Sequence, residues 1–246
     1  MASWIVHLRI AEELLDRIPG LDPEKFALGS VGPDSGKPDE KWENFTPSTR
    51  ITHFQAEDSL HHDCADLEFF RRYLLPLRDG AEAQYIPFRL GYFFHLVTDN
   101  LWGEKIGRPT QQRWSAEFAA DRDFIWEVKK DWYGLDFIYV RDHPDCLYRR
   151  VFLGALPDCA GLEFLVPESL AWSVDHIQRY YQETGERVQQ ACQRPFIYLS
   201  RAEADRFVDE SSARLFRIYQ HLWINGASTG TLATALDLNI GTKGDD

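Results

Sequence analysis

Apolar residues recur at helical spacing along most of the chain. The first such segment runs from Trp4 to Ile18, and Pro19-Gly20 ends it. Ser3 stands at the N-cap position of this segment. Asp22-Pro23 has the composition of a second helix start, with aspartate as the cap and proline at the first helical position. The sequence therefore predicts two helices at its start.

The segment from Phe88 to Trp102 is apolar on nearly every side, which predicts a central, buried helix. Helical spacing predicts further helices over residues 65–75, 110–132, 168–190 and 201–225. Ser200 and Glu203 form a capping box before the last of these. Residues 137–140 fit either a strand or a helical turn. The sum is an all-α domain of six to eight helices over residues 1–238, followed by a flexible tail over 239–246.

Glycine and proline interrupt the pattern between residues 29 and 50. Loops of this length in compact domains are usually functional or disordered. Trp42 and Phe45 lie within this one, and large apolar side chains argue against disorder. We therefore expect a functional loop.

Charge restricts the class of partner. The chain of 246 residues has 39 acidic and 27 basic side chains, a formal net charge of −12. Such a surface repels nucleic-acid duplexes and anionic membranes unless a bound cation reverses the sign locally. No apolar run is long enough for a transmembrane segment, and the start does not resemble a signal peptide. We therefore expect a cytoplasmic protein whose four widely spaced cysteines are reduced thiols.

Candidate chemistry begins with His95 and Asp99, which are four residues apart on the buried helix and share a face. A buried carboxylate is costly unless it is paired or binds a cation, and a simple core hydrogen bond to the histidine remains an alternative. His7, Asp34 and His53 are each unremarkable alone, as core, turn and loop residues. Together the five offer three imidazoles and two carboxylates, a ligand set that suits Zn²⁺.

Four segments that contain these residues resemble, in order, the zinc-dependent phospholipase C and single-strand (P1-type) nuclease family. They are Trp4…His7, Leu28-Gly29-Ser30-Val31-Gly32-Pro33-Asp34, Thr52-His53-Phe54 and Gly91-Tyr92-Phe93-Phe94-His95-Leu96-Val97-Thr98-Asp99. The resemblance covers about residues 1–105. It implies a single-domain, multi-helix bundle of that type and a phosphodiesterase, phospholipase C-like, that hydrolyses phosphoesters with zinc-activated water.

The resemblance also implies the roles of individual residues. It assigns Asp34, His53, His95 and Asp99 to one zinc ion, with Asp99 bridging to a second that His7 also binds. It makes Asp34 the catalytic candidate, a group that orients or deprotonates the attacking water. We expect one or two zinc ions and a small phosphoester or phospholipid headgroup as substrate.

The chain departs from the family pattern after Asp99. Family members complete a further zinc site with a later histidine, followed by a histidine–carboxylate pair at four-residue spacing. Here no histidine lies between His95 and His143, and His176 is followed at that spacing by Tyr180. Trp4 is internal and cannot supply the terminal amine that secreted members use as a ligand. We expect the further site to be lost, or rebuilt from Glu104, Asp123 or Glu127.

Two other functions remain open. The missing histidines favour a non-catalytic relative that keeps the metal for structural reasons and binds a partner. His62-Asp63 could be the central pair of an HD-type phosphohydrolase, although His53 precedes it too closely for the usual arrangement. The substrate and the oligomeric state stay open.

Overall fold

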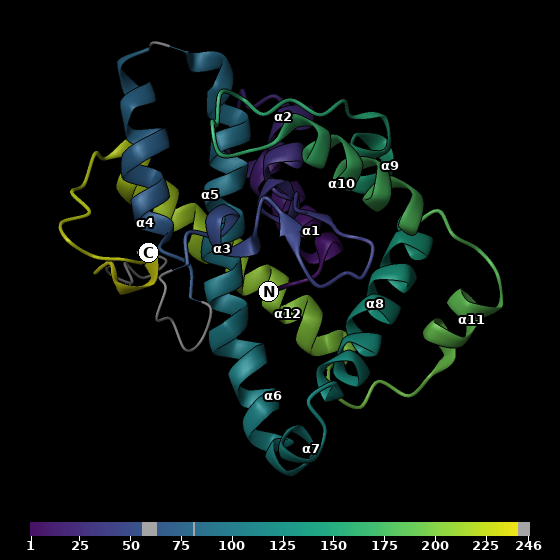
Figure 1. Ribbon diagram of the computed structural model, residues 1–246. Coiled ribbons are helices and arrows are strands. Elements are labelled where there is room, and N and C mark those ends of the chain that lie inside the picture. The colour runs from purple at the N-terminus through teal and green to yellow at the C-terminus, as the bar shows by residue number, and fades with distance from the viewer. Residues whose placement is uncertain (56–62, 81, 241–246) are drawn as a thin grey trace.

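The fold is almost entirely helical, which confirms the all-α prediction. The computed structural model describes residues 1–55, 63–80 and 82–240 (Figure 1). Its helices are α1 (Trp4–Arg17), α2 (Pro23–Gly29), α3 (Thr49–Thr52), α4 (Asp66–Phe69), α5 (Ile86–Trp102), α6 (Arg108–Arg113), α7 (Ser115–Ala120), α8 (Phe124–Asp142), α9 (Leu147–Arg150), α10 (Pro167–Tyr180), α11 (Glu186–Gln193) and α12 (Arg201–Tyr219). Two short strands, β1 (Lys37–Pro38) and β2 (Phe45–Thr46), pair antiparallel.

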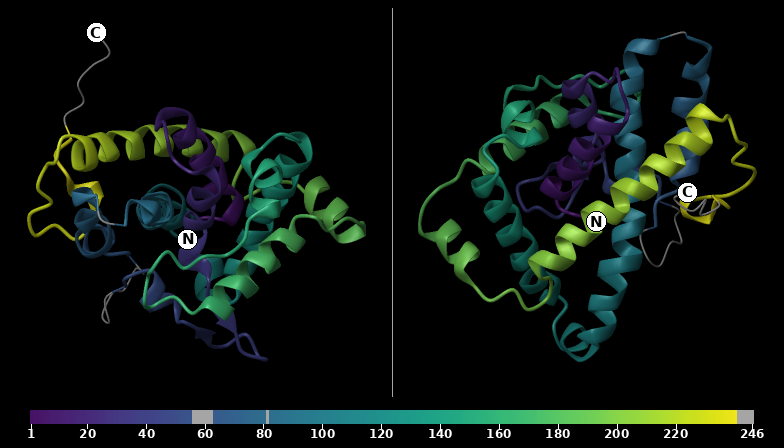
Figure 2. Two further views of the ribbon diagram at one scale, coloured as in Figure 1. Left: turned by 90° about the horizontal axis from the view of Figure 1, so that it is seen from above. Right: turned by 180° about the vertical axis from the view of Figure 1, so that it is seen from behind.

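Helix α5 forms the centre of the molecule, as the sequence predicts. Every one of its residues after Ile86 is buried. Helix α2 packs against it backbone to backbone: a Cβ atom added at Gly91 would lie 2.4 Å from the carbonyl oxygen of Phe26, and one at Gly29 would lie 2.0 Å from that of Phe88. Only glycine allows this approach. Helix α1 lies between α5 and α8 (Figure 1). Helix α12 crosses α1 on the face that is turned toward the viewer in the view from behind (Figure 2).

The two predicted N-terminal helices are present. Helix α1 begins at Trp4 and ends at Arg17. The side chain of Asp22 caps α2 by accepting hydrogen bonds from the backbone N–H groups of Glu24 and Lys25. The N-cap prediction for Ser3 is correct in position but not in bonding, because its hydroxyl donates to Asp136 Oδ1 at 2.8 Å instead of to the helix start.

The prediction of one continuous helix over residues 110–132 is wrong. It is divided into α6, α7 and the start of α8, which then continues through residues 137–140, so that this stretch is helical. Between α7 and α8 the carboxylate of Asp121 accepts a hydrogen bond from the N–H of Asp123 at 2.8 Å. Such local side-chain bonds compete with helical ones. The described chain therefore has more helices than the six to eight expected.

The predicted helix over 168–190 is also interrupted. Helix α10 ends at Tyr180, and α11 begins after Gly185, whose φ of 130° is outside the helical range. The helix over 201–225 has its predicted capping box at Ser200 and changes to a π-helical turn, Gln220–Ile224, after α12. The helix over 65–75 consists of α4, a π-helical turn and a 3₁₀ turn.

The long loop over residues 29–50 is ordered. It holds the 3₁₀ turn Gly32–Asp34, the hairpin of β1 and β2, and the start of α3. The hairpin carries Trp42 against α10, with ring centroids 5.9 Å from Trp172 and 6.1 Å from His176. The loop therefore packs on the protein, and it brings Asp34 into the interior.

All four cysteines are free thiols, as predicted. No described helix combines the length and the apolar composition that crossing a bilayer requires. Most of the predicted flexible tail, residues 241–246, lies outside the described residues.

Asp136 of α8 gives the fold a predictable pH dependence. It is buried and accepts hydrogen bonds from the hydroxyls of Ser3 at 2.8 Å and Tyr181 at 2.6 Å. Burial raises its pKa to about 7, against the lowering effect of these bonds. The unfolded chain loses this proton near pH 4. Between about pH 4 and 7 the native state therefore binds more protons, and its stability falls as the pH rises.

We expect Asp136→Asn to remove this dependence, because the carboxamide stays neutral. The stability of the variant relative to wild type should rise by roughly 4 kcal/mol between pH 4 and pH 8. Urea unfolding of both proteins at several pH values measures this difference. A difference that is constant with pH would contradict the proposed protonation of Asp136.

Candidate metal centre

Five predicted ligands from four segments meet in the interior. His7 comes from α1, Asp34 from the 3₁₀ turn after α2, His53 from the end of α3, and His95 and Asp99 from α5. His95 and Asp99 share one face of α5 because they are one turn apart. The structure therefore brings all five predicted side chains together.

The distances among the five are short. His53 Nε2 lies 3.3 Å from His95 Nε2 and 3.4 Å from both Asp34 Oδ1 and Asp99 Oδ2. Asp99 Oδ2 is also 3.4 Å from His95 Nε2, and Asp99 Oδ1 is 3.4 Å from His7 Nε2. Two groups, His7/His95/Asp99 and Asp34/His53/His95, have ligand atoms within 4.8 Å of one another and could hold a metal ion.

The hydrogen bonds of the imidazoles determine which ring nitrogens carry a hydrogen and which present a lone pair to the centre. His95 Nδ1 lies 2.8 Å from the carbonyl oxygen of Ser30, and His53 Nδ1 lies 3.1 Å from that of Thr49. A carbonyl only accepts, so both Nδ1 atoms carry hydrogen. In the neutral rings the two Nε2 atoms, 3.3 Å apart, are then both acceptors. A cation would turn this repulsion into coordination.

Orphaned polar atoms support the same conclusion. Among the described residues, Asp99 Oδ2 and both ring nitrogens of His7 are buried without a hydrogen-bond partner. Such atoms are rare in native proteins and imply an additional group, such as an ion. Imidazole nitrogen and carboxylate oxygen are ligands of a divalent cation of the zinc type. The donor set therefore fits a metal ion.

The charges show what occupies the centre when only protons are available. Burial and the neighbouring His95 lower the pKa of His7 to about 4. Burial also opposes protonation of His53, but the carboxylates of Asp34 and Asp99, each 3.4 Å from its Nε2, outweigh this effect and raise its pKa to about 9. A proton on His53 then takes the place that a cation would take. Metal binding should release it.

The carboxylates stay ionised. Burial alone would raise both pKa values, but the imidazole of His53, 3.4 Å away, keeps the pKa of Asp34 below its ordinary value. Burial is likewise outweighed at Asp99 by the charges of the chain's ammonium terminus and His95, which hold its pKa well below the ordinary value.

Three supporting contacts, absent from the sequence prediction, position the ligands. The backbone N–H of Ala2 donates to Asp99 Oδ1 at 2.8 Å. The hydroxyl of Tyr92 donates to the carbonyl of Thr52 at 2.6 Å, and Ser173 Oγ donates to the carbonyl of Asp34 at 3.0 Å. Such contacts orient metal ligands. Only Tyr92 had a signal in the sequence, since it is three residues before His95 on the predicted buried helix.

The centre has one accessible side. The side chain of Asp34 is 14% exposed, whereas those of His53, His95, His7 and Asp99 are at most 3% exposed. The His7 and His95 rings stack with centroids 3.7 Å apart. A molecule from solvent therefore reaches the centre past Asp34.

The residues considered for a rebuilt zinc site do not join the cluster. Glu127 pairs with Lys130 and Arg194, and Asp123 stands exposed before α8. His176 stacks on Trp172 with centroids 5.0 Å apart, within a group of aromatic rings. Neither these residues nor Glu104 belong to a group of described residues that could hold a metal.

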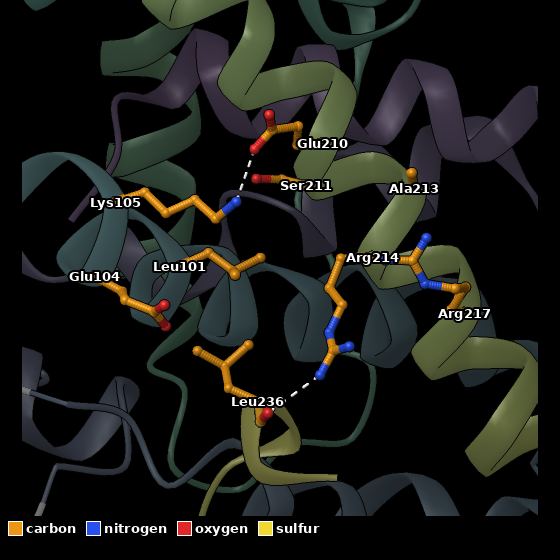
Figure 3. A pocket seen from close by; sticks show the side chains of 9 residues that line it. All are labelled: Leu101, Glu104, Lys105, Glu210, Ser211, Ala213, Arg214, Arg217 and Leu236. Carbon is orange, nitrogen blue, oxygen red and sulfur yellow. Dashed lines mark hydrogen bonds and ion pairs between the residues drawn. The ribbon is translucent and has the colours of Figure 1, made fainter. Parts of the chain in front are cut away.

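Glu104 instead lines a pocket of about 470 Å³ between the end of α5 and α12 (Figure 3). Lys105 pairs there with Glu210 at 2.7 Å, and Arg214 donates to the carbonyl of Leu236 at 3.1 Å. The pocket contains none of the five cluster residues and no histidine or cysteine. Its size alone therefore does not make it a catalytic site.

The other pair considered in the sequence, His62-Asp63, is only partly described. His62 lies outside the described residues, and Asp63 Oδ1 is 3.5 Å from Arg108 Nη1.

Comparisons with known proteins identify no relative. No family model matches the chain, and neither the curated proteins nor the solved structures contain a match.

Proposed function

We propose that the protein is a metal-dependent phosphoester hydrolase that uses zinc at the cluster of His7, Asp34, His53, His95 and Asp99. One observation carries the proposal: the carboxylates of Asp34 and Asp99 and the Nε2 atom of His95 all lie 3.3–3.4 Å from His53 Nε2 in the interior, and Asp99 Oδ2 has no hydrogen-bond partner among the described residues. Retaining such a cluster without a cation would cost several kcal/mol of buried, unsatisfied polar groups.

Zinc is the proposed ion because the ligands combine nitrogen and oxygen. Harder cations such as Mg²⁺ and Ca²⁺ prefer oxygen ligands alone. Both candidate groups include His95, whose Nδ1 is engaged by Ser30, so His95 offers one nitrogen to one ion. A second ion would depend on His7 and Asp99. We therefore propose one zinc ion at Asp34, His53, His95 and Asp99. A second zinc ion would be held by His7 and by Asp99, which would bridge the two ions.

A bound divalent cation supplies Lewis acidity toward phosphoryl oxygens and acidifies water near it. Asp34 then has the position of a catalytic group, since its carboxylate is the accessible one. Its backbone is fixed by the 3₁₀ turn Gly32–Asp34 and by Ser173. We assign it to orienting the attacking water and accepting a proton from it.

One observation favours a second function. Four of the five ligands are almost completely buried, as in a structural metal site that only stabilises the fold. The protein would then be a non-catalytic relative of such hydrolases, which keeps the metal to stabilise the fold and binds a partner.

Assays of the zinc-loaded protein decide between the two. We expect hydrolysis of at least one substrate in a panel of chromogenic phosphomonoesters, phosphodiesters and phosphorylcholine esters, with loss of activity in a chelator and recovery on adding Zn²⁺. Elemental analysis of the same sample gives the number of ions per chain. A folded, zinc-loaded protein that cleaves none of the panel would overturn the hydrolase proposal and leave the structural site.

A further inference from the structure

Lys129 of α8 is a half-buried lysine with no carboxylate partner. Its Nζ lies 4.8 Å from the centroid of the Trp126 ring and 5.9 Å from that of Trp132. In the part of the chain that the structure describes, no carboxylate lies within ion-pair distance of it. The adjacent Lys130 differs, since its side chain is 60% exposed and pairs with Glu127. The two indole rings are therefore the contacts of this ammonium group in the described structure, and they leave its charge unbalanced by an anion.

The face of α8 that carries Lys129 lies toward the metal centre. Lys129, Tyr133 and Asp136 share this face, because they are four and three residues apart. Asp136 accepts a hydrogen bond from the hydroxyl of Ser3. Ala2, the residue before Ser3, donates a hydrogen bond from its backbone N–H to Asp99. This two-residue link connects the face directly to a metal ligand.

The same two carboxylates of the centre act on the ammonium group. Burial lowers the pKa of Lys129, and the charges of Asp34 and Asp99 oppose that effect. Neither carboxylate forms an ion pair with it within 4.0 Å. The charge of Lys129 is therefore close enough to the centre to interact with both carboxylates, without an ion pair to either of them.

The charge of the centre indicates what Lys129 could bind beside it. Two carboxylates cancel the charge of one divalent cation held with neutral imidazoles, which leaves only the chain's ammonium terminus as positive charge beside Asp99. Lys129 adds one positive charge in a desolvated setting, where Coulomb interactions are stronger than in water. An ammonium group makes short, strong hydrogen bonds to phosphoryl oxygens.

We propose that Lys129 binds a phosphoryl oxygen of the substrate on the α8 side of the metal centre. This role rests on the proposed phosphoester hydrolase function and adds a residue that no ligand pattern includes. Its Nζ lies beside the rings of Trp126 and Trp132, and the substrate's negative charge would take the place of a carboxylate partner.

Binding of inorganic phosphate to the zinc-loaded protein tests the role without requiring turnover. Lys129→Met keeps a long, unbranched side chain beside the two indoles and removes the charge. Lys129→Gln is used instead if the methionine variant does not fold. Lys130→Met is the matched control, because it removes a neighbouring charge from an exposed position. Calorimetry gives the phosphate Kd, and elemental analysis gives the zinc content of each protein.

We expect the phosphate Kd to rise about tenfold or more in Lys129→Met or Lys129→Gln, at unchanged zinc content, and to stay within twofold of wild type in Lys130→Met. Equal phosphate affinity in wild type and the Lys129 variants, loss of zinc from those variants, or no phosphate binding by zinc-loaded wild type would each overturn the proposal. Lys129-dependent phosphate binding by a protein that cleaves no ester would support the anion site and reject the hydrolase.

Discussion

Asp99→Asn is expected to abolish tight zinc binding. Asp99 lies close to all three histidines of the cluster, with His7 at 3.4 Å from one oxygen and His53 and His95 at 3.4 Å from the other. A carboxamide is uncharged, and its nitrogen cannot coordinate a cation. We expect the zinc content to fall from one or two ions per chain to about a tenth or less after dialysis.

The same substitution should lower stability both with and without zinc. Wild type with zinc at about 1,000 times its Kd gains about 4 kcal/mol, or roughly 10 °C in Tm for a chain of this length. Asp99→Asn should lose this gain. Without metal it should also be less stable than wild type near neutral pH, because the low pKa of Asp99 means that the fold stabilises its charged form, which a carboxamide lacks.

Thermal unfolding with and without zinc measures both effects, with Asp209→Asn, an exposed aspartate of α12, as the control that keeps metal binding. An Asp99→Asn protein that retains a full zinc content and its stabilisation would show that the cluster is not the metal site.

The helical core could be predicted from the sequence because its apolar pattern is strong. The buried helix over 88–102 matches α5 within two residues at its start, and the Asp22 cap of α2 is correct. Helix breaks were missed at Asp121 and Gly185, where a local hydrogen bond and one backbone angle decide the conformation. These effects involve single residues and barely change the hydrophobic period.

The metal ligands could also be predicted, as side chains that converge. Their residue types carry the chemistry, and His95 and Asp99 share one helix face by spacing alone. The groups that hold these ligands in place could not be predicted from the sequence. They are backbone groups, which every residue has: the carbonyls of Ser30 and Thr49 and the amide of Ala2. Lys129 gave no signal either, since a lysine pair on a helix normally indicates a solvated surface.

The proposed catalytic role of Asp34 leads to the second large effect. Asp34→Asn should lower kcat by about 10²–10⁴-fold, the usual contribution of a positioned general base. A carboxamide oxygen can still lie near the cation, but it cannot accept a proton from water. The substitution removes the accessible carboxylate and leaves the buried ligands in place. We therefore expect kcat to fall much more than the zinc content measured at saturating Zn²⁺.

Rates on the best substrate of the panel, the zinc content and the Tm of Asp34→Asn should be compared with those of Asp209→Asn, for which no change is expected. Glutamate at position 34 tests the position of the carboxylate separately, since it keeps the charge and moves it by one methylene group. Full activity in Asp34→Asn at saturating zinc would assign the proton transfer to another group.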